Sequence, residues 1–325
     1  MPIEEKVSKE LGVKSNKDIN ERIGIPAYIA ACRSYVNSCS DNWRYYIERI
    51  GRWVDMDNAY YTMSPEFMES VIWAFKQIYN KGLIYKGKRV SLYSTDTSTP
   101  VSQFEVAMDP DNYRDIDDLS VFVKFQLTPE SLNELQINNY QLPLYIIAWT
   151  TTPWTIPSNF ALAVNPDYTY ALVEYENELL IVAKDRIAYT FNVKEGHIGS
   201  EEGNIVRIIC EFKGKTLQGL SYIPVFDFFK EQSSENDFKI YLYEGVTIEE
   251  GTGVLHLAPA FGEEDFNLGK KHSITCLPDI DEEGNMTVGE WKGMYLRDAS
   301  AIIAENLRQK GNLLRSEVYT HRLPF

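Results

Sequence analysis

Beyond about residue 90, the apolar residues of this chain fall into short runs separated by polar turns, a pattern that limits the fold more than any other feature. Residues 121–127 alternate in the way that is typical of a half-buried strand. Further strands are expected at residues 144–148, 168–175, 178–183, 205–210, 240–243 and 253–257. Only two short helices are expected here, at residues 184–190 and 299–310. Many short strands with few helices predict a β-rich, barrel-like domain over residues 98–318.

The preceding part of the chain, residues 16–82, has the apolar spacing that is typical of helices. We expect Asp41 to cap one helix, and Ser64 to cap a second helix that Gly82 ends. The second helix carries an apolar stripe, which we expect to pack in a core: Phe67, Val71, Ile72, Phe75, Ile78 and Tyr79. The sequence therefore predicts an α+β fold, in which a helical segment over residues 1–97 precedes the barrel-like domain.

The composition excludes several classes of protein. Hydrophobic residues make up 44% of the 325 residues, which argues against a disordered chain. No apolar run approaches the ~20 residues that cross a membrane, so we expect no membrane partner. The net charge of −15 argues against nucleic acid as a main partner, although local basic positions can still hold a phosphate backbone.

The four cysteines show no Cys-x-x-Cys pairing and lie near no histidine at metal-binding spacing. They are Cys32, Cys39, Cys210 and Cys276. We therefore expect free thiols in a reducing compartment, the cytoplasm, and no metal site.

Three consecutive threonines, Thr150, Thr151 and Thr152, follow the apolar run at residues 144–148. Threonine favours strands, so strand propensity alone is one explanation. In a strand, Thr150 and Thr152 would face one way and Thr151 the other. Pro153 ends the strand and places these hydroxyls at a loop, where binding sites usually lie.

A second patch, residues 251–265, combines glycines, a histidine and acidic residues. Gly253 permits an unusual backbone angle or the close approach of a ligand. His256 follows an apolar pair, and a histidine on a strand is more often a core residue than a catalyst. Asp265 ends an acidic run, which is usually a solvated face. The patch matches neither a P-loop nor a dinucleotide fingerprint, and we interpret the two patches as one site.

The two motifs resemble the isoleucyl-tRNA synthetases. Trp-Thr-Thr-Thr-Pro-Trp-Thr-x-Pro-Ser-Asn at residues 149–159 and Gly-Thr-Gly-Val-Leu-His-x-Ala-Pro-Ala-Phe-Gly-x-Glu-Asp at residues 251–265 are similar to the family's editing insertion, connective polypeptide 1. The related valyl and leucyl enzymes carry Thr-Arg-Pro at the first motif. The resemblance extends over nearly the whole chain and is strongest to the eukaryotic-type, cytoplasmic enzymes.

The ends of the chain also look like segments of that family. Pro2-Ile3-Glu4 is similar to the end of a His-Gly-Leu-Pro-Ile-Glu motif, and residues 321–325 are similar to the segment before a Cys-Trp-Arg motif. The ATP-site signatures His-Ile-Gly-His and Lys-Met-Ser-Lys-Ser do not occur. The resemblance implies a piece of a longer synthetase, in which residues 1–97 flank the catalytic core and residues 319–325 return toward it.

The resemblance implies hydrolysis of valine from misacylated tRNA(Ile), because a site for isoleucine cannot strongly reject valine; this family is the standard example of that limit. Asp265 would hold the α-ammonium group, and His256 would exclude isoleucine. Whether His256 also moves protons stays open. Thr150, Thr151 and Thr152 would bind the ester, the ribose or the attacking water. Other substrate-binding residues would be Trp149, Trp154, Asn159, Gly253, Ala258 and Pro259.

The same resemblance implies partners and cofactors. The partners would be the tRNA(Ile) 3′ end carrying valine and the remainder of the synthetase chain, and the piece would be monomeric. No cofactor is expected in this chain, whereas ATP and Mg²⁺ would serve the full-length ligase. The alternative interpretation is a catalytically silent module that docks tRNA or supports the synthetase.

Overall fold

The computed structural model describes residues 2–13, 18–95, 98–107, 113–137, 142–201 and 205–324. The chain divides into two compact units. The first comprises residues 1–88 and 93–99, and the second comprises residues 89–92 and 100–325. Each unit is described by itself.

The first unit is helical and contains α1 (Pro2–Leu11), the π-helical turn η1 (Ile19–Ile23), α3 (Ile25–Arg49) and α4 (Pro65–Asn80). The expected start and end of α4 are confirmed, because the Ser64 hydroxyl accepts a hydrogen bond from the Phe67 N–H at 3.2 Å and Gly82 follows the helix with a φ of 71°. The expected helix start at Asp41 is wrong. The backbone at Asp41 lies inside α3, because no glycine or proline interrupts the chain between Pro26 and Gly51.

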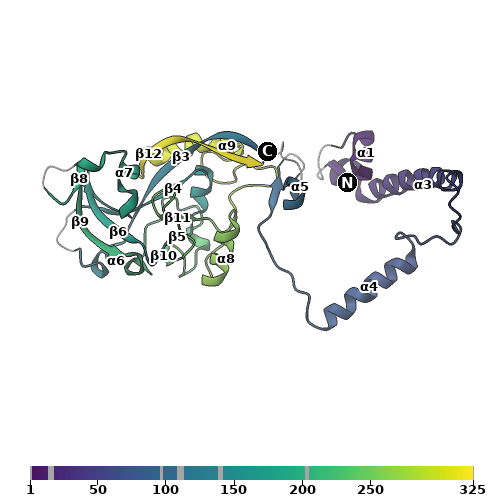
Figure 1. Cartoon of the computed structure of the whole chain (residues 1–325), viewed down its shortest axis with the longest axis horizontal. Helices are drawn as coiled ribbons and strands as arrows, with labels where there is room; N and C mark the ends of the chain where they lie inside the picture. Colours follow the sequence, from purple (N-terminus) through teal and green to yellow (C-terminus); the bar gives the residue numbers. More distant parts are fainter. Residues whose placement is uncertain are drawn as a thin grey trace. The chain divides into compact units, whose positions relative to one another are not determined.

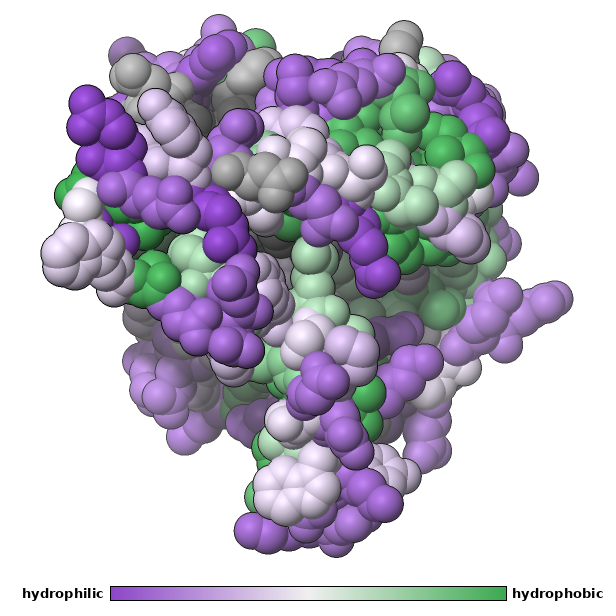
Figure 2. Space-filling model, turned by 90° about the vertical axis from the view of Figure 1, so that its right-hand side faces the viewer, coloured by the Kyte–Doolittle hydropathy of each residue, from purple (hydrophilic) through white to green (hydrophobic). Residues whose placement is uncertain are grey.

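The apolar stripe of α4 does not pack in a core within its unit, contrary to expectation. Five of its side chains are between 46% and 67% exposed: Val71, Ile72, Phe75, Ile78 and Tyr79. Hydrophobic residues likewise reach the surface between hydrophilic ones on the face that Figure 2 shows. The predicted helix is therefore confirmed, but its predicted burial is not. An amphipathic helix becomes buried only where a second apolar surface lies against it.

The second unit is built on a mixed seven-stranded sheet with the order β12-β3-β4-β7-β6-β9-β8 (Figure 1). Its strands are β3 (Tyr113–Gln126), β4 (Leu144–Thr150), β6 (Thr169–Tyr175), β7 (Glu178–Ala183), β8 (Ile198–Gly199), β9 (Val206–Lys213) and β12 (Leu313–Pro324). A three-stranded sheet has the order β10-β5-β11, from β10 (Lys239–Leu242), β5 (Ala161–Val164) and β11 (Val254–Leu257). The α+β class is confirmed. The large sheet is open, with β12 and β8 at its edges.

Helices are short in the second unit, and both of those expected from the sequence are present. Residues 184–190 form η4 (Lys184–Arg186) and α7 (Ile187–Phe191), and residues 299–310 lie in α9 (Leu296–Gln309). The others are α5 (Gln103–Ala107), α6 (Pro129–Glu134), η3 (Pro153–Ser158), η5 (Glu195–His197), η6 (Gly214–Leu217), η7 (Lys230–Gln232) and α8 (Glu263–His272). A small two-stranded sheet pairs β1 (Leu92–Ser94) with β2 (Thr99–Val101).

The large sheet buries both of its faces, because a hydrophobic cluster packs on each side. Successive side chains along a strand point to opposite faces and therefore enter different clusters. On β4, Ile146 and Ala148 belong to the larger hydrophobic cluster, which also contains Ile303 of α9. Ile147 points to the opposite face and packs in a second cluster with Ile187 of α7. Every residue of β4 therefore has a defined side, which fixes where the threonines that follow can point.

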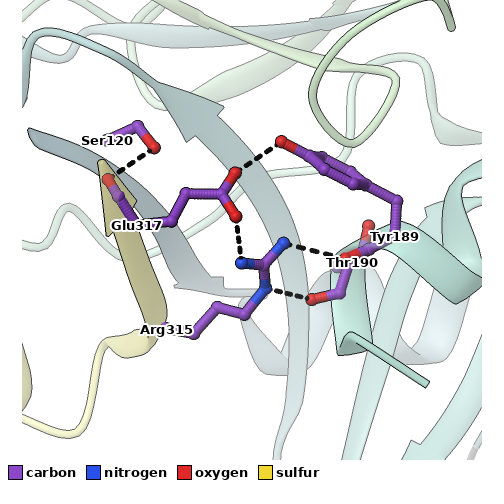
Figure 3. A network of polar contacts seen from close by, with 5 residues as sticks. All are labelled: Ser120, Tyr189, Thr190, Arg315 and Glu317. Carbon is purple, nitrogen blue, oxygen red and sulfur yellow. Dashed lines mark hydrogen bonds and ion pairs between the residues drawn. The ribbon is translucent and has the colours of Figure 1, made fainter. Parts of the chain in front are cut away.

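A network of charged and aromatic side chains ties the edge strand β12 to α7 (Figure 3). The Arg315 guanidinium donates to the backbone oxygens of Thr190 and Tyr189 at 2.9 and 2.8 Å and lies 3.8 Å from the centre of the Phe122 ring. Glu317 accepts hydrogen bonds from Arg315 at 2.6 Å and from the Tyr189 hydroxyl at 2.5 Å. The arginine thus binds carbonyl groups at the C-terminal end of a helix, where a positive charge is favourable.

Candidate functional site

The threonine run sits at the end of β4, with Thr150 and Thr152 on the same side. Their hydroxyl oxygens are 3.0 Å apart, and the Thr152 N–H donates to Thr150 Oγ1 at 3.1 Å. No described hydrogen bond joins Thr151 to them. The backbone then turns into η3 at Pro153, which has no N–H to continue the sheet. The contacts therefore agree with the expected alternation, in which Thr150 and Thr152 share a side and Thr151 does not.

A buried threonine that the sequence analysis missed connects this run to the second motif. Thr155 Oγ1 lies 3.2 Å from Thr152 Oγ1, donates to the Thr152 carbonyl at 2.8 Å, and lies 3.0 Å from His256 Nε2. Thr155 belongs to the Thr-Pro-Trp-Thr sequence, so the motif was the available signal. The structure thus joins the two motifs through side chains, as the sequence analysis expected of one site.

His256 is held on its other side by Asn159, and each of the two residues is buried with 6% of its surface exposed. Asn159 Nδ2 lies 2.7 Å from His256 Nδ1 and donates to the Ala161 carbonyl at 2.9 Å. The Tyr222 hydroxyl donates to Asn159 Oδ1 at 2.6 Å. Tyr222 belongs to neither motif, and nothing in the sequence around it indicated that it would support Asn159.

Strand pairing explains why His256 faces Thr155. His256 lies opposite Leu162 in the pairing of β11 with β5, and it shares a side of β11 with Val254. Leu162 and Val254 both belong to the cluster that also contains Ile146 of the large sheet. The imidazole therefore points between the two sheets. Burial lowers the pKa of His256 to about 3, so the ring is neutral at physiological pH.

Asp265 lies in the first turn of α8, beside the end of β11. Its Oδ2 accepts a hydrogen bond from the Ala258 N–H at 2.9 Å. Burial raises the pKa of Asp265 to about 6, and the hydrogen bond from Ala258 opposes that rise. Pro259 supports this arrangement by packing against α8, where a Cβ placed on Gly269 would lie 3.1 Å from its ring. The acidic run is thus a helix start that holds one half-buried carboxylate in place.

The structure brings only one of the two tryptophans to the site. The Trp154 ring contacts the Phe261 ring edge to face, with centres 4.9 Å apart, and so links the two motifs. Trp149 points to the opposite face of the sheet, where its ring packs 5.1 Å from Tyr319 and 6.5 Å from Phe122. Since Trp149 directly precedes Thr150, the same alternation that joins Thr150 to Thr152 directs the indole away from them.

Gly253 positions the strand that carries His256. Its φ is 76°, and a Cβ at this position would lie 2.4 Å from Ala183 Cβ at the end of β7. The Gly253 carbonyl accepts a hydrogen bond from the Tyr170 hydroxyl at 2.6 Å. A glycine is therefore required here for close packing of β11 against the large sheet.

The site combines hydroxyls, a neutral imidazole and one carboxylate, which can position a polar substrate and a water molecule. Within the described ranges, no three or more His, Cys, Asp or Glu side chains are grouped so that they would hold a metal ion. The expected absence of metal and cofactor stays a prediction. None of the four cysteines, all of which lie in the described part of the chain, forms a disulfide. Among the same described residues, no helix is long and apolar enough to cross a membrane.

Comparison with known proteins identifies the family. Residues 1–291 match the family model of tRNA synthetases class I (I, L, M and V). The whole chain is 37% identical to the cytoplasmic isoleucine–tRNA ligase of Mus musculus and 37% identical to the isoleucine–tRNA ligases of Protochlamydia amoebophila and Thermus thermophilus. It spans 25% of the first relative's length and 29% of each of the other two. Bacterial relatives are as similar as the eukaryotic one, so the eukaryotic-type assignment stays a prediction.

Solved structures with a related arrangement are less similar. GlLeuRS-CP1 has a TM-score of 0.48 and 15% identity, over 61% of this chain and 98% of that one. The cytosolic leucyl-tRNA synthetase editing domain of P. knowlesi has a TM-score of 0.45 and 14% identity, over 64% of this chain and 98% of that one. The family match and the identity over the full length are sufficient: the chain belongs to the class I tRNA synthetases of the I, L, M and V group.

Proposed function

We propose that residues 98–318 form an editing domain that hydrolyses the ester between valine and tRNA(Ile), within a synthetase that attaches isoleucine to that tRNA. The observation that carries the proposal is the hydrogen-bonded connection from Thr150 and Thr152 through Thr155 to His256, which makes one site of the two motifs. Asp265 is fixed beside that site through Ala258. The resemblance of both motifs to the isoleucyl editing insertion supports the choice of substrate.

The charges of the site suit an aminoacyl ester. Asp265 is a titratable carboxyl group beside this cluster, and its ionised form would pair with the α-ammonium of the substrate in a charge-assisted hydrogen bond. His256 is neutral and held by hydrogen bonds on both nitrogens, so its ring would act as a rigid wall against a larger side chain. One methylene group changes the free energy of binding by about 1–3 kcal/mol. A rigid ring at this position would exclude isoleucine because its side chain is one methylene larger than that of valine.

The proposed reaction is hydrolysis by a positioned water molecule. The water oxygen bonds to the ester carbon, the bond from that carbon to the ribose oxygen breaks, and the ribose oxygen takes one water proton. The other proton leaves as the new carboxyl group of valine ionises. The threonine hydroxyls would orient the water, and the neighbouring ribose hydroxyl of the tRNA would assist. ATP and Mg²⁺ would serve the ligase reaction of the longer protein, and no hydrolytic step runs through them.

The test is release of labelled amino acid by the 325-residue chain. We expect release of valine from valyl-tRNA(Ile) and none from isoleucyl-tRNA(Ile). Asp265→Asn removes the charge that holds the ammonium and should lower valine release at least tenfold. His256→Ala removes the wall and should allow isoleucine release.

The matched control is Asp185→Asn, which makes the same change at an exposed residue of η4 and should leave both rates unchanged. If the unaltered chain releases no valine above the spontaneous rate, the hydrolytic proposal fails and the silent docking module becomes the better explanation. If His256→Ala still leaves isoleucyl-tRNA intact while cleaving valyl-tRNA, the role of His256 as a wall is wrong.

A further inference from the structure

The network around His256 contains two groups whose hydrogen-bonding direction is fixed by chemistry. A carbonyl oxygen can only accept a hydrogen bond, so any partner at bonding distance must be a donor. The Ala161 carbonyl lies 2.9 Å from one side-chain atom of Asn159, and the Thr152 carbonyl lies 2.8 Å from the Thr155 hydroxyl. These two contacts determine where the protons of the network lie.

The first contact fixes the side of His256 that faces Asn159. The Asn159 atom beside the Ala161 carbonyl must be the amide nitrogen, and the same nitrogen lies 2.7 Å from His256 Nδ1. Since that nitrogen is a donor, His256 Nδ1 must accept and carries no proton. The Tyr222 hydroxyl donates to the amide oxygen at 2.6 Å, which opposes rotation of the amide.

The second contact fixes the other side of the ring independently. The single proton of Thr155 is committed to the Thr152 carbonyl, so Thr155 Oγ1 can only accept from its remaining neighbours. His256 Nε2, at 3.0 Å, must therefore donate and carry the ring proton. Both ends of the network thus require the same Nε2–H tautomer of His256.

The proton order extends outward to the half-buried threonines. Because Thr155 Oγ1 can only accept, the Thr152 hydroxyl at 3.2 Å must donate to it. The Thr150 hydroxyl at 3.0 Å must in turn donate to Thr152 Oγ1. Both hydroxyl protons then point inward, which leaves lone pairs of Thr150 and Thr152 for a donor that arrives from outside. A water molecule that donates to such an oxygen keeps its own lone pairs free.

We propose that Asn159, anchored by Tyr222, is a positioning residue that fixes His256 as the Nε2–H tautomer, and that Thr155, committed to the Thr152 carbonyl, makes Thr150 and Thr152 hydrogen-bond acceptors toward the attacking water. The part that concerns the water rests on the proposed hydrolytic function. The tautomer and the proton order do not, since they follow from the contacts alone. In this arrangement His256 is no general base, because one nitrogen is protonated and the other is occupied by Asn159.

The test is the ¹⁵N spectrum of the histidine side chains in the 325-residue chain, in which protonated and unprotonated ring nitrogens have distinct shifts. The chain has four histidines, and the signal lost in His256→Gln identifies the one of interest. We expect a protonated Nε2 and an unprotonated Nδ1 at neutral pH. Asn159→Asp replaces the donor by an acceptor of the same shape, so we expect Nδ1 to gain a proton and valine release to fall at least tenfold.

The matched control is Asn165→Asp, the same substitution at an asparagine that is likewise 6% exposed and donates to the backbone oxygens of Glu244 and Val246. It should leave the tautomer of His256 unchanged. A protonated Nδ1 in the unaltered chain, or an Nδ1 that stays unprotonated in Asn159→Asp, would overturn the proposal. The unaltered chain decides the tautomer even if Asn159→Asp fails to fold. Absence of valine release with the expected tautomer would instead refute the hydrolytic function and leave the proton order standing.

Discussion

Burial moves the pKa values of His256 and Asp265 in opposite directions. It lowers the pKa of His256 to about 3 and raises that of Asp265 to about 6, because a buried group resists the charged form. At neutral pH the imidazole is therefore uncharged and the carboxyl group is ionised. Asp265 then presents a negative charge, which suits a substrate with an α-ammonium group.

The pKa of Asp265 predicts how hydrolysis depends on pH. Only the carboxylate form can pair with the ammonium group, so valine release should rise with pH through a midpoint near 6. The measurement is kcat/KM for valyl-tRNA(Ile) between about pH 5 and pH 8, corrected for the spontaneous rate. Asp265→Asn should give a low rate without that midpoint. A profile of the unaltered chain that shows no change near pH 6 would contradict the ion-pairing role.

Single residues of the site were predictable from motifs, but their partners were not. Thr150, His256 and Asp265 stand in sequences that indicated a site. The supporting role of Tyr222 depends on a fold that brings it to Asn159 across 63 positions of the chain. Trp149 is a different case, because the alternation that was applied to the threonines also directs the indole to the other face.

Among the elements, strands with a clear apolar alternation or a continuous apolar run were predicted, and several without either pattern were missed. The expected strand at residues 178–183 coincides with β7. Two strands were missed for different reasons. β5 is short and rich in alanine, which has low strand propensity. β12 carries polar residues because it lies at an edge of the sheet. The acidic run at the start of α8 was interpreted as a solvated face, so the helix itself was not predicted. Acidic residues are nevertheless typical of a first helical turn.

Arg315 should be a main stabiliser of the contact between β12 and α7. Arg315→Met keeps apolar contact with Phe122 but removes hydrogen bonds to two backbone oxygens, so we expect a loss of about 2–3 kcal/mol in the free energy of unfolding. Lys184→Met is the control, because the ion pair of Lys184 with Glu211 is largely exposed and should contribute below about 1 kcal/mol. Urea unfolding measures both. Equal losses would show that Arg315 has no special role.

At the scale of the whole molecule, the sequence predicted the class of fold but not its closure. Closure depends on whether the two edge strands meet, and no local pattern encodes that pairing. Among the residues that the structure describes, β12 pairs with β3 and β8 pairs only with β9, so the sheet stays open. The helical segment illustrates the same limit, since the stripe on α4 predicts an apolar surface without specifying its partner.

A buried carboxyl group should make the stability of the molecule depend on pH. Both side-chain oxygens of Asp279 are buried without a hydrogen-bond partner, and burial raises the pKa of Asp279 to about 7. The Ser158 hydroxyl opposes this rise, although it lies outside hydrogen-bond geometry. The folded chain therefore holds a proton between about pH 4 and pH 7 that the unfolded chain has released, so this residue lowers stability as pH rises through that window.

Asp279→Asn removes that titration. Relative to the unaltered chain, the variant should gain stability as pH rises from about 4 to about 7, by an amount on the order of a few kcal/mol. Urea unfolding at several pH values measures the difference, and Asp185→Asn at the exposed η4 serves as the control without such a trend. A difference between Asp279→Asn and the unaltered chain that does not vary with pH would contradict the buried, protonated state.

The tie between β12 and α7 also has a consequence for the order of folding. Pairing β12 with β3 joins residues up to 211 positions apart, Pro324 with Tyr113, and the entropy of closing so long a loop delays contacts of this kind. The hairpin of β6 and β7 turns within two residues, Glu176 and Asn177, and is the kind of contact that forms in microseconds. Arg315 would then act after the rate-limiting step. Its loss would speed unfolding and leave the folding rate nearly unchanged, so the edge strand determines how long the native state lasts.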